Sequence, residues 1–248
     1  MNDPHVVSLT YSFEPTSSLE IVNAPALPID SDAFTGRLDN GLLTLEPRDH
    51  FPDIETARTV SDRFVKAWQI AVGLDLGRAG FSFQYRRAHV IDRKADPGSL
   101  SASLSGVAAV SAVASVRATR HEYPPPPADF RLTPEVETLW ERYCQYQEGR
   151  EPLLAMAYFC LTVLVPKGED RSDAAQRLSI EERVLDKIGE LTSERGDNAT
   201  ARKMRPTTRP LTADERAWIE AAVKAIIQHL ATAQQGHKLT MANLPPLP

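Results

Sequence analysis

The residues with the clearest chemical potential lie in one basic segment, residues 195–209, of an acidic chain. The segment holds one acid, Asp197, and five cations, which gives it a local charge of +4; the cations are Arg195, Arg202, Lys203, Arg205 and Arg209. A guanidinium group presents a planar fork of N–H donors that matches a phosphate or a carboxylate. The segment is therefore a candidate binding site for a phosphate, a nucleic-acid backbone or an acidic protein partner.

The same cations have a second interpretation, in which they bind no ligand. Runs of like charge in loops are usually solvated, or they neutralise acids on neighbouring helices, and Glu151 is one such acid. We favour this structural interpretation over the ligand-binding one. The five cations remain the binding residues that the sequence predicts.

Patterns typical of catalysis and of metal binding do not occur in the sequence. It contains no Gly-rich dinucleotide or phosphate loop, no nucleophile elbow, no zinc-protease motif and no EF-hand loop. No histidine shares a helical face with another histidine or a cysteine, and Cys144 and Cys160 lack zinc-finger spacing. We therefore predict no catalytic residue, no metal site and no cofactor. We favour a protein that is not an enzyme.

Composition places the chain among ordinary globular proteins. It has 248 residues, a net charge of −5 and 42% hydrophobic residues, and neither half is basic. The longest apolar-rich run, residues 153–165, is shorter than the roughly 18 residues of a membrane-spanning helix, and the first residues do not resemble a secretory signal. We expect a cytoplasmic protein with no membrane contact, and nucleic acid is not the favoured partner.

The first half of the chain is expected to be rich in β-strands. Residues 6–13 alternate strictly, with Val7, Leu9, Tyr11 and Phe13 on one face. Shorter strands are predicted at 19–23, 34–38 and 42–45, and Asn40-Gly41 predicts a tight hairpin turn between the last two. Four strands would then precede a helix that Asp53 caps and that Gly73 or Gly77 ends.

Further strands are predicted after that helix. Residues 81–85 and 100–105 alternate between two faces, whereas residues 107–118 fit either a strand or a helix, and we favour a strand. Residues 1–122 would therefore form a β-rich domain covered by one helix. Four successive prolines follow Tyr123, and they predict a linker over residues 123–130.

The second half is expected to be a bundle of about four helices over residues 131–236. Thr133 and Pro134 begin the first helix, and residues 152–165 form a buried second one. Ser179 with Glu182, and Thr212 with Glu215, have the spacing of capping boxes that begin two more. Gly236 would end the last helix, and residues 237–248 would form a flexible Pro-rich tail. The fold class is α+β, with a β-rich part followed by an all-α part.

The helical half resembles small uncharacterised bacterial proteins that are labelled as J-type methylamine-utilisation proteins. The resemblance rests on Tyr143-x-x-Tyr146, on residues 149–153, on Ala157-Tyr158-Phe159, on residues 180–191 and on the motifs Arg195-Gly196-Asp197 and Ala201-Arg202-Lys203. It implies an accessory role without known chemistry.

The layout of the helices is also similar to HEPN-type bundles, several of which are ribonucleases that act as dimers. Those enzymes carry an Arg shortly before a His near their final helices, and no Arg in this helical half is followed by a His at that spacing. We therefore expect a binding or accessory protein that contacts a protein partner or a second copy of itself. The alternative is a HEPN-like nucleic-acid-binding or nuclease-type effector that uses residues 195–209.

Overall fold

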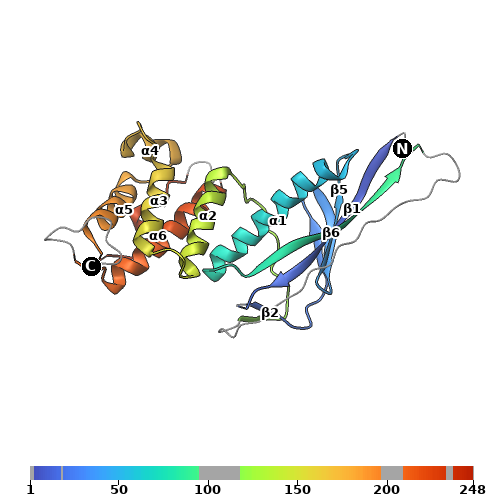
Figure 1. The fold of residues 1–248 in the computed structure, drawn as a ribbon, viewed down its shortest axis with the longest axis horizontal. Helices are drawn as coiled ribbons and strands as arrows, with labels where there is room; N and C mark the ends of the chain where they lie inside the picture. Colours follow the sequence, from blue (N-terminus) through green and yellow to red (C-terminus); the bar gives the residue numbers. More distant parts are fainter. Residues whose placement is uncertain (1–2, 18, 95–117, 197–208, 233–236, 248) are drawn as a thin grey trace. The chain divides into compact units, whose positions relative to one another are not determined.

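The computed structural model describes residues 3–17, 19–94, 118–196, 209–232 and 237–247. The chain divides into two compact units, Met1–Ala128 and Asp129–Pro248 (Figure 1). The first unit contains a five-stranded antiparallel sheet with one long helix, and the second is helical. The predicted α+β class, with strands first and helices second, is confirmed.

The sheet has the strand order β3-β4-β5-β1-β6. Its strands are β1 (Pro4–Pro15), β3 (Leu27–Asp30), β4 (Phe34–Asp39), β5 (Leu42–Pro47) and β6 (Phe81–Asp92). Two further strands, β2 (Leu19–Ile21) and β7 (Ala118–Arg120), pair in parallel as a separate small sheet. Five strands rather than four therefore precede the first helix. The one that the sequence did not predict, β3, has four residues and contains Pro28, which an edge strand tolerates.

Strand β1 follows the predicted alternation over most of its length. Leu9, Tyr11 and Phe13 are buried against the core, as predicted. The pairing with β6 shifts between Val6 and Ser8, so a β-bulge lies at this point. Because a shift of one residue exchanges the two faces of a strand, Val6 is buried in the core and Val7 is only half-buried.

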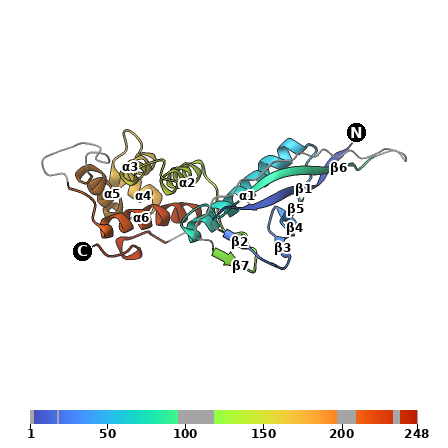
Figure 2. The same ribbon diagram turned by 60° about the horizontal axis from the view of Figure 1, so that its bottom comes forward.

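Helix α1 (Ile54–Leu76) lies along one face of the sheet (Figure 2). The side chain of Asp53 accepts a hydrogen bond from the Thr56 amide, and Gly77 ends the helix in a left-handed conformation with φ of 72°. Trp68, which is fully buried, donates from its indole nitrogen to the carbonyl oxygen of Pro124 at 3.0 Å. The first residues of the Pro-rich segment therefore pack in the core of the sheet unit.

The second unit contains five α-helices in the described residues, one more than predicted. They are α2 (Pro134–Gln147), α3 (Leu153–Leu164), α4 (Arg171–Leu178), α5 (Glu182–Glu194) and α6 (Ala213–Thr232). Helix α4 was not predicted because its eight residues are too few for a periodic apolar pattern. The predicted capping box at Ser179 is wrong, since Ser179 ends α4 with φ of 53° and Glu181 precedes α5.

The Pro-rich tail differs from the prediction of a flexible segment. Leu239 and Leu244 are each 8% exposed, on either side of the short 3-10 helix η1 (Met241–Asn243). The Leu239 amide donates to the carbonyl oxygen of Ser179 at 3.0 Å, and the Glu181 amide donates to that of Leu239 at 2.7 Å. Residues 239–244 therefore pack against the start of α5. The sequence does not predict this packing, because two isolated leucines form no periodic apolar pattern.

Several predictions fall outside the described residues. These are the strand at 100–105, the ambiguous stretch up to residue 117, and Gly236 as the end of α6. No helix in the described part of the chain is long and apolar enough to cross a membrane.

Gly36 in β4 is a position at which a side chain should destabilise the sheet. Its φ is +155°, and a Cβ atom there would lie 2.0 Å from the carbonyl oxygen of Thr44 on β5. We expect Gly36→Ala to lower the free energy of unfolding in urea by more than about 1 kcal/mol. Gly41→Ala is the matched control, because Gly41 has φ of +74° but a Cβ atom there would have no neighbour within 4 Å. Equal stability of the two variants would contradict the close contact.

Candidate functional site

The two ends of the basic segment meet in the structure. Helix α5 ends at Glu194, and Arg195, the next residue, forms a parallel β-bridge with Arg209, which precedes α6. The Gly196 amide donates to the carbonyl oxygen of Arg209 at 2.9 Å. Residues far apart along the chain are thereby held side by side, between the end of one helix and the start of the next.

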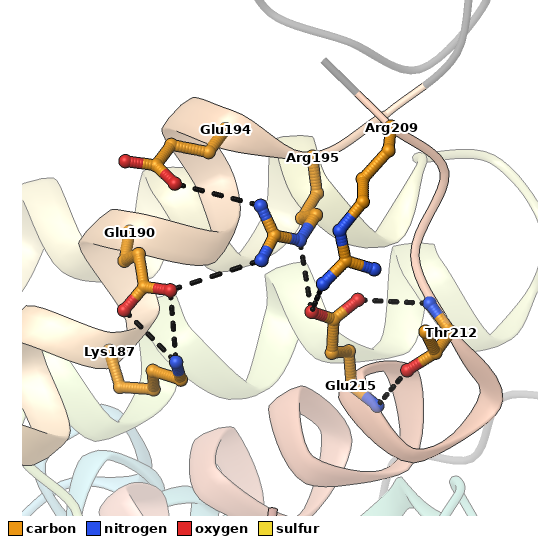
Figure 3. A network of polar contacts seen from close by, with 7 residues as sticks. All are labelled: Lys187, Glu190, Glu194, Arg195, Arg209, Thr212 and Glu215. Atoms are coloured by element: carbon orange, nitrogen blue, oxygen red, sulfur yellow. Dashed lines mark hydrogen bonds and ion pairs between the residues drawn. The ribbon is translucent and has the colours of Figure 1, made fainter. Parts of the chain in front are cut away.

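A buried carboxylate, that of Glu215, receives both arginines. Its Oε1 atom accepts from Arg195 Nε at 2.9 Å and from Arg209 Nη2 at 3.0 Å (Figure 3). Its Oε2 atom accepts from the Thr212 amide at 3.0 Å, and the Glu215 amide donates to Thr212 Oγ1 at 3.1 Å. The predicted capping box at Thr212 and Glu215 is thus confirmed, and it orients the carboxylate towards the arginines.

Neighbouring charges complete a compensated network around Arg195. One of its nitrogens lies 3.6 Å from Glu194 and another lies 4.0 Å from Glu190. Glu190 also pairs with Lys187 at 2.9 Å. The network in Figure 3 therefore contains three cations, at Lys187, Arg195 and Arg209, and three carboxylates, so its formal charge is zero.

The protonation of Glu215 suits a structural role. Burial raises the pKa of this carboxyl group, but the hydrogen bonds from the Thr212 amide and from Arg195, together with the charges of Arg195 and Arg209, outweigh burial. The net result is a pKa below the ordinary value of 4.5, so Glu215 stays ionised at neutral pH. A carboxylate that is held ionised by two guanidinium groups is a poor general acid or base.

The five predicted binding residues have different outcomes. Arg195 is taken up by the network, with its side chain 12% exposed, whereas the side chain of Arg209 is 52% exposed and contacts Glu215 with one nitrogen. Arg202, Lys203 and Arg205 lie outside the described residues.

The acids that pair with Arg195 and Arg209 are Glu190, Glu194 and Glu215, and the predicted acid Glu151 is not among them. Glu151 instead accepts a hydrogen bond from Arg142 at 3.2 Å. The sequence predicts Glu215 only as part of a helix cap. The available signal was its capping-box spacing from Thr212, together with its place on the buried side of α6.

Three buried side chains, Cys160, Tyr11 and Tyr143, have raised pKa values. Burial raises the pKa of the Cys160 thiol to about 12, and burial likewise raises the pKa values of Tyr11 and Tyr143. An activated nucleophile requires a lowered pKa, so these groups are shifted towards unreactive forms. The described part of the chain also contains no group of three or more metal-ligating side chains.

Removal of the charge at Glu215 should destabilise the helical unit. We expect Glu215→Gln to lower the free energy of unfolding by about 2 kcal/mol, because the Thr212 amide and the partly buried Arg195 lose a charged acceptor. Glu194→Gln is the control, since the Glu194 side chain is 58% exposed and contacts the same arginine. We expect a change within about 0.5 kcal/mol for that variant. Equal effects in chemical denaturation would contradict the role of Glu215.

Acid should remove the contribution of Glu215. A carboxyl group with a lowered pKa in the folded chain stabilises it fully above the ordinary pKa of 4.5, and this stabilisation disappears as the pH falls through the lowered folded value. We therefore expect the stability difference between the wild type and Glu215→Gln to be constant near neutral pH and to shrink below about pH 4.5. Urea unfolding at a series of pH values measures it. A difference that grows on acidification would have the wrong sign.

Comparisons with protein-family models, with curated proteins and with solved structures found no match for the chain. The resemblances to J-type methylamine-utilisation proteins and to HEPN-type bundles therefore stay predictions.

Proposed function

We propose that the chain is a cytoplasmic binding or accessory protein that acts through protein–protein contacts and catalyses no reaction of its own. The observation that supports this most is the charge balance around Glu215. The strongest local charge feature of the sequence meets compensating acids at both of its ends within the chain. Because Arg195 and Arg209 are already paired within the chain, we propose that the protein acts through another part of its surface.

The contact surface that we propose is the outer edge of strand β6, the edge that faces away from β1. This strand stands at one end of the sheet order and is twelve residues long, and within the described residues β1 is the only strand that pairs with it. An edge strand presents backbone N–H and C=O groups that a strand of another chain can pair with. Ile91 adds an exposed apolar side chain, 38% exposed, near the end of β6. We propose that a second copy of the chain pairs here.

The nucleic-acid alternative receives less support. The chain has a net charge of −5, and Arg195 is largely enclosed by the network at the base of the basic segment. Nucleic-acid binding depends on cations that are free to neutralise phosphates and to release counterions. Arg202, Lys203 and Arg205, which fall outside the described residues, would have to supply most of that charge.

Self-association is the property to measure. We expect light scattering after size-exclusion chromatography to give a mass that rises from monomer to dimer with concentration. Ile91→Lys should shift the chain towards monomer, because a charge at a strand edge opposes pairing. Ile54→Lys is the matched control, since Ile54 is 40% exposed but lies on α1, and it should behave as the wild type.

A monomeric mass at every concentration would contradict self-association through β6, as would equal effects of the two lysine variants. Salt-dependent binding of RNA or DNA that is lost in the Arg202→Ala, Lys203→Ala double variant would favour the nucleic-acid alternative instead.

A further inference from the structure

Two histidines that are far apart in sequence meet at one corner of the sheet unit. The Nδ1 atoms of His5 and His50 lie 3.0 Å apart, and the ring centroids are 5.0 Å apart. His5 belongs to β1, and His50 lies in the connection between β5 and α1. The connection is fixed to β1 by a backbone hydrogen bond from the Val6 amide to the Phe51 carbonyl oxygen at 2.9 Å. The backbone therefore holds the two rings together.

The separation of the two nitrogens matches a chelating pair. A transition-metal ion binds imidazole nitrogen at about 2.0–2.1 Å. Two such nitrogens in adjacent positions of a square-planar or octahedral ion lie about 2.9 Å apart, whereas tetrahedral positions lie about 3.4 Å apart. The observed 3.0 Å is closer to the first arrangement. Square-planar and tetragonal sites with nitrogen ligands are typical of Cu²⁺ and Ni²⁺.

We propose that His5 and His50 form a two-imidazole site for a divalent transition-metal ion of the Cu²⁺ or Ni²⁺ class. Solvent would complete the coordination, because the His50 side chain is 40% exposed. The proposal does not depend on the proposed function, and it concerns a different part of the chain from the basic segment.

The carboxylate of Asp3 lies near the second ring nitrogen of His50. Oδ1 of Asp3 lies 3.8 Å from Nε2 of His50, the ring nitrogen that does not face His5. Histidines that bind metal usually direct their second nitrogen towards a carboxylate or carbonyl group, which fixes the tautomer and orients the ring. The Asp3 amide in turn donates to Asp92 at 3.0 Å. The charge of the nearby Arg93 opposes a cation at His5, whereas the charge of Asp3 favours one.

Titration of the purified chain with Cu²⁺ tests the proposal, with calorimetry for affinity and electron paramagnetic resonance for the ligand atoms. We expect one site with two nitrogen donors. His5→Asn and His50→Asn should each weaken binding about tenfold or more, and Asp3→Asn should weaken it less. His89→Asn is the control, because His89 is an exposed histidine on β6, and it should leave the affinity unchanged.

The two histidine variants also distinguish Cu²⁺ bound by both histidines from Cu²⁺ bound by other groups. The His50→Asn variant retains the amino terminus and His5, so Cu²⁺ bound at the terminus would survive in it. Unchanged affinity in His5→Asn or His50→Asn would overturn the proposal and leave the 3.0 Å contact as an N–H···N hydrogen bond. Circular dichroism of each variant verifies that the chain remains folded.

Discussion

The contact between the end of α5 and the start of α6 depends on one buried carboxylate, that of Glu215. A buried carboxylate is strongly unfavourable unless charged and hydrogen-bonding partners surround it. Glu215 has two guanidinium groups and a backbone amide as partners, one guanidinium from each end of the basic segment. The same contacts fix the position of α6 relative to the end of α5. Breaking them would leave Arg195, 12% exposed, without its closest acceptor.

This interaction also sets what the basic segment can do. A ligand anion that approached Arg195 or Arg209 would have to compete with an internal carboxylate that is already in place. In the three-to-three charge balance of the network, such an anion gains little from long-range attraction. Arg195 and Arg209, at the base of the segment, therefore act as structural partners of α6.

Local patterns predicted the elements that are periodic and long. The alternation of β1, the Asn40-Gly41 turn, the cap at Asp53 and the start of α2 at Thr133 all follow from rules that act over a few residues. The failures are equally local in origin. A bulge moved Val6 into the core, and Ser179 adopted a left-handed conformation that closes α4 rather than opening α5. Neither the bulge nor the conformation of Ser179 can be predicted from the local sequence, because each depends on the packing around it.

The candidate sites were harder to predict because they join distant residues. The sequence indicated Arg195 and Arg209 as cations, but their pairing with Glu215 requires the β-bridge that holds Arg195 beside Arg209. His5 and His50 have no helical spacing at all, and only the position of the β5–α1 connection beside β1 brings them together. The most direct test of the structural role of Glu215 is a double-mutant cycle of Arg195→Gln and Glu215→Gln in urea unfolding. A favourable coupling energy above about 1 kcal/mol is predicted, and additive effects of the two substitutions would contradict it.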